Sequence, residues 1–483
     1  MAKLIKSPHP EWALKAKTKG TELRNISGKY YLYSVTSKYD PVLKRSKKVT
    51  GKLLGSVTEK DGFVESEKRI LQKPHTPVID VATICVRESG FTGFINGYST
   101  EILEKLKRFF PDEWIWVLYM AFCRLVHHSP IKNMPFHVAK SMLSADNKFT
   151  LNDKAFSDAL RNIGKQRSTV TDYLQSFITP GDHVMVDMTN IFSSSNKMYY
   201  AKEGYNSDMI FDRQFNLMYI YSAKLLQPVF YRLYAGNIRE VTAFKICLKE
   251  SGLSDAVVIA DKGFYSNANV EALNSEGIKF IMPLKRDSNL IKYEMIQDAK
   301  KHFKYNDRYV WFSTWENDGM QITGFRDDKL RVQEEKDYLD RIITTPESYN
   351  EEGFYNRRHA FGTMTMITNT GLAADQIYAT YKSRNTVEVM FDGLKTILAA
   401  DHSYMQNEDA LQGWMFVNHI ALQWYYVIYK MLQGANLLSR YSVSDFIKHL
   451  YEIKKVRINN EWLPEPQIKA TENLLKKLNI SIT

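Results

Sequence analysis

The chain has 483 residues, of which 44% are hydrophobic and 25% charged, so it can form about two to four domains with sizeable cores. Its three cysteines (Cys85, Cys123 and Cys247) are far apart, which argues against a disulfide framework or a thiolate zinc site and favours a reducing, cytoplasmic compartment. The first residues lack the apolar segment of a secretory signal. A net charge of +11 favours a polyanionic partner, because lysine and arginine side chains on phosphates release counterions.

The N-terminal part predicts two regions of different character. Residues 28–70 alternate polar and apolar side chains and are interrupted by glycines, which predicts a small β-meander with a basic loop at 41–49. Residues 97–178 carry apolar side chains at helical spacing. We therefore expect a β-rich domain over 1–90 and a helical DNA-binding region over 91–180.

The next region predicts an α/β core. Its predicted elements alternate in the order strand, strand, strand, helix, strand, helix, strand, and they cover residues 183–187, 215–223, 229–235, 241–251, 256–261, 267–276 and 278–283. This order is the one expected of a ribonuclease H-like catalytic core. We place the first part of that core at 181–285.

Residues 286–361 interrupt the α/β order with charged and aromatic sequence, including strand-like pieces at 308–314 and 320–325. We expect a β-rich insertion domain there, followed by the second part of the core at 362–435 and a helical region at 436–483. The second part begins with a strand over 361–369 and continues with one long helix over 375–398. Residues 410–429 contain no charged side chain, but their polar residues favour a buried helix over a membrane span.

Two aspartates follow apolar strand patterns. Asp187 ends the sequence Val-Met-Val-Asp, and Asp261 ends Val-Val-Ile-Ala-Asp. Ligands of open α/β sheets bind at the carboxyl ends of the strands, where both aspartates are expected. The two carboxylates therefore converge if their strands are neighbours. Carboxylates with water and phosphate oxygens are the ligands that Mg²⁺ prefers. Either aspartate alone is better explained as a turn-capping residue.

The predicted helix over 375–398 carries a second group of functional side chains. Tyr381, Arg384, Glu388 and Lys395 fall within a sector of about 60° at roughly 100° per residue. One helix face therefore presents a carboxylate with cations a turn away. Taken alone, this pattern also fits a solvated face with ion pairs such as Arg384–Glu388.

The spacing of these four residues resembles the Y-(2)-R-(3)-E-(6)-K signature of bacterial insertion-sequence DDE transposases, most closely the IS-four superfamily. The resemblance covers about 180–430 and includes further short matches, which are Asp187-x-Thr189, Gly204-Tyr205-x-x-Asp208, Gly236-Asn237, Asp261-x-Gly263-Phe264 and Met366-Ile367-Thr368-Asn369. It implies a DNA transposase of bacterial origin, cytoplasmic and nucleoid-associated, with no membrane partner.

The resemblance also implies residue roles. Asp187, Asp261 and Glu388 would be catalytic and bind Mg²⁺, with Mn²⁺ able to substitute, while Tyr381, Arg384 and Lys395 would bind DNA. The enzyme would act as a homodimer on double-stranded DNA, on the terminal inverted repeats of the element and on target DNA. Some relatives flip a base onto a tryptophan of the insertion, a role that Trp311 or Trp315 would take if neither is an ordinary core residue.

Two alternatives remain open on the sequence. One is a ribonuclease H-like nuclease that cuts DNA without integration. The other is a non-catalytic DNA-binding descendant of a transposase. Joined strand-transfer products separate the first alternative from a transposase, and metal-dependent nicking separates the second.

Overall fold

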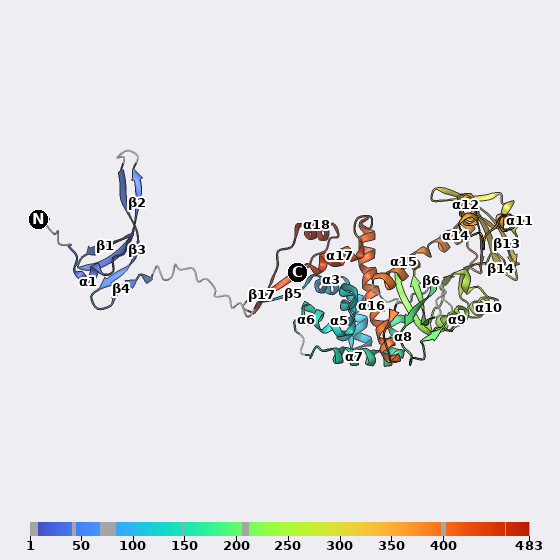
Figure 1. Cartoon of the computed structure of the whole chain (residues 1–483), viewed down its shortest axis with the longest axis horizontal. Helices are drawn as coiled ribbons and strands as arrows, with labels where there is room; N and C mark the ends of the chain where they lie inside the picture. The colour runs from blue at the N-terminus through green and yellow to red at the C-terminus, as the bar shows by residue number, and fades with distance from the viewer. Residues whose placement is uncertain are drawn as a thin grey trace. The chain divides into compact units, whose positions relative to one another are not determined.

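The computed structural model describes residues 8–40, 45–67, 84–146, 149–204, 212–397, 402–458 and 460–482; among these, the side chains of residues 40, 240, 385, 386, 388, 392, 396 and 397 are not described. The chain forms two compact units, Met1–Ala82 and Thr83–Thr483 (Figure 1). Each unit is described by itself below.

The first unit contains a short helix and, in its described part, a four-stranded antiparallel sheet in the order β1-β2-β3-β4. Its elements are α1 (Glu11–Leu14), β1 (Thr21–Ile26), β2 (Lys29–Asp40), β3 (Arg45–Thr58) and β4 (Gly62–Glu65). A small core forms where side chains of α1 meet the sheet, and its buried members are Ala13, Leu23, Leu32 and Val57. The predicted β-meander is confirmed.

The basic loop expected at 41–49 is wrong for residues 45–49, which belong to β3 and pair with residues 36–40 of β2. Residues 41–44 lie outside the described residues. The run of lysines suggested a loop, but a ribbon solvated on both faces accommodates charged side chains equally well.

The second unit begins with one short strand, β5 (Cys85–Glu88), and continues with a group of helices. These helices are α3 (Gly90–Tyr98), α4 (Thr100–Phe109), α5 (Trp114–His127), η2 (Ile131–Asn133), α6 (Met134–Ala139), η3 (Met142–Ser144), α7 (Asp153–Lys165) and α8 (Arg167–Gln175). The apolar periodicity buries Leu106, Met120 and Leu160 in one continuous core. The predicted helical character of residues 97–178 is confirmed.

A mixed sheet forms the centre of this unit. Its middle elements are β6 (His183–Ser193), β7 (Lys202–Glu203), β8 (Arg213–Ser222), β9 (Gln227–Ala235), α9 (Glu240–Ser251), β10 (Val257–Ala260), η4 (Lys262–Phe264), α10 (Asn267–Ser275) and β11 (Lys279–Pro283). β6, β10 and β11 are parallel neighbours, whereas β6, β8 and β9 are antiparallel neighbours. The predicted alternation of strands and helices is confirmed, with β7 as an addition at the edge. The first strand, however, does not end at Asp187 as predicted: it continues to Ser193, because residues 188–192 keep pairing with β8.

Residues 286–361 extend this sheet and also add helices. The elements that follow β11 are α11 (Tyr293–Gln297), β12 (Lys301–Tyr305), β13 (Arg308–Asn317), β14 (Met320–Asp327), α12 (Asp328–Thr344), α13 (Glu351–Arg357), η5 (Arg358–Ala360) and β15 (Thr363–Thr368). β14 pairs with β15, which pairs with β11. The expected β-rich insertion contains strands β12 to β14, but it also contains helices that the sequence did not predict, of which α12 is the longest. The N-terminus of α12 is capped by the Asp327 carboxylate, which accepts from the Lys329 and Leu330 N–H groups at 3.1 Å.

The long helix expected over 375–398 is wrong, because the structure divides it. α14 (Ala374–Lys382) ends before Ser383, α15 (Asn385–Asp392) follows, and the π-helical segment η6 (Gly393–Ile397) comes last. At the junction the Arg384 N–H donates to the Tyr381 carbonyl at 3.0 Å and the Val387 N–H to the Arg384 carbonyl at 2.8 Å. These three-residue spacings tighten the turn and rotate α15 relative to α14.

The uncharged segment forms a buried helix, as predicted. α16 (Glu408–Gly434) packs against α5, α7 and β9, and most of its side chains from Ala410 to Ile428 are buried (Figure 1). Among the described residues, no helix combines the length and the apolar character that a bilayer crossing requires.

Gly413 lets α16 approach α7 closely, since an added Cβ would collide with the Leu160 carbonyl oxygen. We expect Gly413→Ala to lower the free energy of unfolding by about 2 kcal/mol, because the two backbones must separate. Gly434→Ala is the matched control at the open end of the same helix, where nothing lies within 4 Å of the added atom. It should be neutral or slightly stabilising. Denaturant unfolding of both variants tests this, and equal stability would contradict it.

The C-terminal region contains α17 (Val443–Tyr451), β17 (Lys454–Ile458), β18 (Glu461–Pro464) and α18 (Lys469–Lys477). The expectation that residues after 436 are entirely helical is wrong, because β17 pairs with both β18 and β5. Asn460 adopts a left-handed φ of 68° in the tight turn between the two strands. Strand β16 (His402–Ser403) pairs with the end of β6.

Candidate active site

Asp187 and Asp261 lie next to each other in the central sheet, at the point where β10 ends and β6 continues to Ser193. Ala260, the last residue of β10, pairs with Val186 of β6 in parallel register. The next residue of each strand is an aspartate, so the two carboxylates project from equivalent positions. The convergence expected if these strands are neighbours is therefore confirmed. Both side chains are partly accessible, with 18% of Asp187 and 35% of Asp261 exposed.

Arg384 bridges the two carboxylates. Its Nη2 lies 2.9 Å from Asp187 Oδ2, and its Nη1 lies 3.9 Å from Asp261 Oδ1. The Arg384 side chain is only 15% exposed, so little water separates it from the acids. The turn between α14 and α15 places this guanidinium over the sheet edge. One cation thus occupies the position between two carboxylates.

Asp187 is held from the backbone as well. Its Oδ1 accepts a hydrogen bond of 2.8 Å from the Met188 N–H. Burial raises the pKa of Asp187 above its ordinary value, the Arg384 charge lowers it, and the nearby Asp261 charge raises it again. Because burial outweighs the hydrogen bonds and the arginine, this carboxyl group takes up a proton more readily than a free aspartate does.

Tyr381 and Arg384 complete the described part of this site. Burial and the Asp261 charge raise the pKa of Tyr381 to about 12, so its hydroxyl remains a hydrogen-bond donor at neutral pH. The Arg384 pKa is raised, since Asp187 and Asp261 stabilise the cation more than burial opposes it. Both side chains are therefore suited to meet negatively charged oxygen atoms.

The other two predicted residues are placed less completely. Glu388 belongs to α15, and its side chain is not described. Lys395 lies one segment further on, in η6, with a partly exposed side chain. Among described side chains, no group of three or more histidines, cysteines or acids gathers closely enough to hold a metal, and Glu388 is not in that set. Of the family-like short matches, Tyr205 and Asp208 also lie outside the described residues.

A buried polar cluster beside the site was missed by sequence reasoning. Tyr219 of β8 pairs with Asp187 in register, and its ring stacks at 5.8 Å on His419 of α16. Tyr219 also meets Phe391 of α15 edge to face, at 6.2 Å between ring centroids. The cluster therefore ties together the sheet, α15 and α16 behind Asp187. The sequence offers only a weak indication of this cluster, because Tyr219 and His419 each stand as one polar residue within an apolar stretch.

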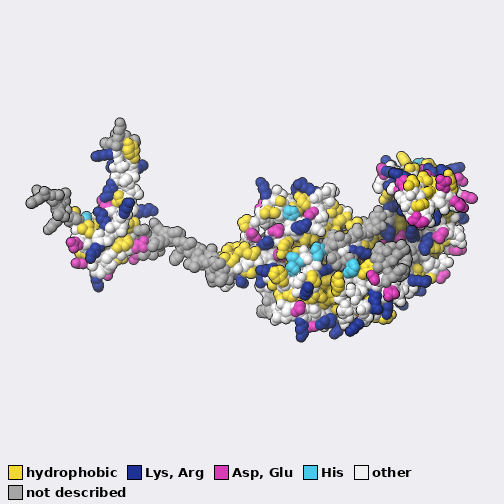
Figure 2. Space-filling view, viewed as in Figure 1, with side chains coloured by type: hydrophobic (Ala, Val, Ile, Leu, Met, Phe, Trp, Pro, Cys, Tyr) yellow, Lys and Arg dark blue, Asp and Glu magenta, His cyan; other side chains and the backbone are white. Residues whose placement is uncertain are grey.

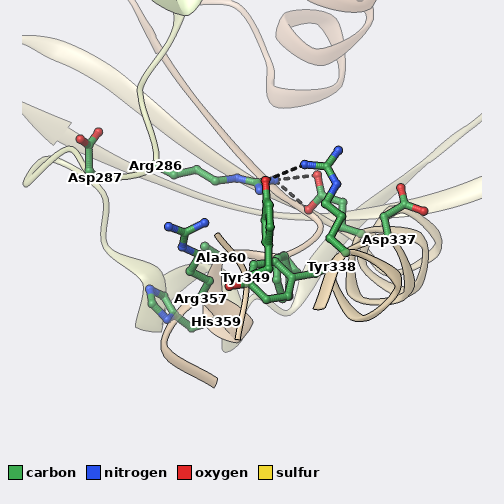
Figure 3. A pocket seen from close by; sticks show the side chains of 11 residues that line it. Arg286, Asp287, Asp337, Tyr338, Tyr349, Arg357, His359 and Ala360 are labelled. Carbon is green, nitrogen blue, oxygen red and sulfur yellow. Dashed lines mark hydrogen bonds and ion pairs between the residues drawn. The ribbon is translucent and has the colours of Figure 1, made fainter. Parts of the chain in front are cut away.

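A surface hollow of about 670 Å³ lies in the region 286–361 (Figure 3). Arg286 binds both carboxylate oxygens of Glu334 at 2.8 Å, and Arg341 donates to the Tyr349 hydroxyl at 2.8 Å. These two cations are thus already engaged within the wall of the hollow. None of the six predicted site residues lines it.

The two tryptophans considered for base stacking differ in exposure. Trp315 is 8% exposed, and its indole N–H donates to the Leu290 carbonyl at 3.2 Å, so it is a core residue. Trp311 is partly exposed, with His302 at 4.8 Å and Arg326 at 5.6 Å from its ring. Of the two rings, only that of Trp311 offers surface to a ligand.

Comparison with known proteins places this site within a matched region. The family described as "Transposase DDE domain" matches residues 179–424, just over half of the chain. Among solved structures, similarity is found to a piggyBac transposase synaptic complex with hairpin DNA, with a TM-score of 0.41 and 10% identity over 75% of this chain and 79% of that chain. A second is the Mos1 transposase paired-end complex with left transposon end, with a TM-score of 0.15 and 13% identity over 32% of this chain and 54% of that chain. No curated protein matches the sequence.

Proposed function

The chain belongs to the transposase DDE domain family, and from this premise we propose that it binds the terminal inverted repeats of an insertion sequence, cuts the DNA there and joins it to target DNA. The observation that carries the proposal is the pair Asp187 and Asp261 at equivalent positions of adjacent parallel strands, Asp187 within β6 and Asp261 directly after β10, inside the matched region. The Y-(2)-R-(3)-E-(6)-K spacing favours the IS-four superfamily.

The order β9-β8-β6-β10-β11, in which β8 alone runs antiparallel to the other four strands, supports a ribonuclease H-like core. β6 and β10 are the first and fourth strands of this five-stranded arrangement, and their pairing brings Asp187 next to Asp261, while α15 holds Glu388. We propose the domain limits given by the sequence for the core, 181–285 and 362–435.

The donor set fits divalent metal ions. Asp187 and Asp261 supply hard oxygen ligands, and the guanidinium that bridges them demonstrates that a cation is stabilised between the two. We propose that Asp187, Asp261 and Glu388 hold Mg²⁺, with Mn²⁺ as a substitute. When bound, the metal activates an attacking oxygen and stabilises the leaving one.

The protein's own residues supply positioning. A phosphodiester must lie in line with water or a 3′-hydroxyl, and fixing that geometry lowers much of the barrier. Arg384 lies nearest to the carboxylates and carries a planar fork of donors that suits phosphate oxygens. The protonated Tyr381 hydroxyl donates beside it, and Lys395 extends the cationic surface along η6. We propose that these three residues grip the DNA backbone next to the cut.

A supercoiled plasmid carrying a marker between the DNA segments that flank the gene tests this proposal. With Mg²⁺, we expect cuts at the outer boundaries of paired inverted repeats and joined products with a short target duplication at each side. Because two ends must be cut together, the active species is expected to be a dimer on DNA. Metal-dependent cuts without joined products would point to a nuclease, and no cutting would point to a non-catalytic DNA-binding protein.

A further inference from the structure

The first unit contains a two-stranded ribbon that extends beyond its small sheet (Figure 1). β1 pairs with β2 only up to Ser34, and β4 pairs with β3 only from Gly55 onward. Residues 36–40 of β2 and 45–49 of β3 therefore form strand pairs only with each other among the described residues. At about 3.3 Å per residue this ribbon, here called the basic ribbon, is roughly 16 Å long.

The basic ribbon has no apolar layer on either face. Residues 36–39 and 45–49 are all exposed, including Tyr39 at 62% and Val49 at 41%. An isolated pair of strands is only marginally stable in water, so it contributes little to the folding of this unit. The core formed by Ala13, Leu23, Leu32 and Val57 lies entirely at the other end of the sheet. A ribbon of this kind is explained better by binding than by folding.

Its charges are arranged unfavourably for the isolated protein. Lys38 pairs directly with Lys47 across the ribbon, whereas Arg45, two residues before Lys47 on the same face, pairs in register with Asp40. Like charges directly opposite each other destabilise a strand pair. None of the ion pairs among the described residues involves Lys38, Arg45 or Lys47. Lysine and arginine side chains lie on both sides of the ribbon (Figure 2). A bound polyanion would neutralise the repulsion between these cations, because its negative charges attract both of them.

We propose that the basic ribbon enters the major groove of double-stranded DNA, with Lys38, Arg45 and Lys47 directed at the phosphates and base edges. The proposal rests on the function proposed above and adds to it the element that holds the DNA. A major groove about 12 Å wide accepts a two-stranded ribbon, whose strands lie about 4.8 Å apart. The alternative occupant, a second copy of this ribbon, is opposed by the matching positive charge of the two copies.

The test compares two triple variants of the full chain that lose the same charge. The ribbon variant is Lys38→Gln with Arg45→Gln and Lys47→Gln. The control is Lys17→Gln with Lys19→Gln and Lys60→Gln, three exposed lysines of the same unit outside the ribbon. Fluorescence anisotropy with a duplex of about 40 base pairs of mixed sequence, at several salt concentrations, measures affinity and its salt dependence.

We expect the ribbon variant to bind at least about tenfold more weakly at low salt. The slope of log affinity against log salt should fall in magnitude by about 2 to 3, because each lost phosphate contact removes about 0.9. The control should keep the slope of the unaltered protein. Methylation of guanine N7 in the probe should weaken binding of the unaltered protein but not that of the ribbon variant, since this atom lies in the major groove.

Equal slopes for the ribbon variant and the unaltered protein would overturn the proposal, as would binding that is insensitive to guanine methylation. A change in oligomeric state of the ribbon variant, with unchanged DNA affinity, would instead assign the ribbon to self-association. If the unaltered protein binds no duplex at all, the function proposed above fails. If the unaltered protein binds the duplex and the ribbon variant binds it with the same affinity and salt dependence, the ribbon is misassigned but the proposed function stands.

Discussion

The Asp187→Asn protein is expected to cut DNA at least about 10³-fold more slowly than the unaltered protein. A bound metal contributes several kcal/mol to the barrier reduction, and every ~1.36 kcal/mol is a factor of ten. Asparagine keeps the size of the side chain but removes the negative charge that would hold the cation. Asp261→Asn and Glu388→Gln should produce losses of the same order, because the proposed function has all three acids hold the same metal ions. Single-turnover cutting of an end-containing duplex measures the effect.

DNA binding separates a chemical loss from a folding loss. The Asp187→Asn protein should bind duplex DNA no more weakly than the unaltered protein, since the lost carboxylate repels phosphate. Asp318→Asn is the matched control, because Asp318 is exposed in the turn between β13 and β14 with a φ of 48°, a conformation that asparagine accepts. It should cut at the normal rate. Cutting by the Asp187→Asn protein within tenfold of normal would remove Asp187 from the active site.

Arg384→Gln is expected to change metal affinity and stability in opposite directions. Without metal, the two carboxylates lose the cation that neutralises them, and disrupting a largely buried pair should lower the free energy of unfolding by about 3 kcal/mol. With Mg²⁺, the vacated position becomes available, so binding should be at least about tenfold tighter than in the unaltered protein. The stabilisation by added Mg²⁺ should therefore be larger in the variant.

Thermal unfolding with and without Mg²⁺ measures both effects without depending on DNA cutting. The unfolding temperature of the unaltered protein should rise little on addition of Mg²⁺, since the metal must first displace the Arg384 guanidinium. Arg161→Gln is a suitable control, because Arg161 forms an exposed pair with Asp158 on α7 and such pairs contribute little. An unchanged response of the Arg384→Gln protein to Mg²⁺ would mean that the arginine and the metal do not compete.

Much of the central sheet was predictable from the sequence, because buried strands and amphipathic helices differ in period. The apolar strand residues before Asp187 and before Asp261 are identified in this way, but the first strand continues past Asp187 to Ser193, which the polar residues after it do not predict. The adjacency of the two strands does not follow from local sequence. Parallel strands separated by more than sixty residues are joined by ladder hydrogen bonds that no local pattern encodes, and the structure supplies that pairing.

The sequence by itself determined which residue types were available and near which elements they lie: two aspartates that follow apolar strand residues, and a helical segment carrying Tyr381, Arg384, Glu388 and Lys395. Only the tertiary structure decided that this segment breaks at Ser383, that Arg384 spans both aspartates, and that β17 pairs with β5. The physical reason is the distance along the chain over which each interaction acts. Periodicity and capping act within a few residues, whereas ion pairs and strand pairing depend on groups brought together by the whole fold.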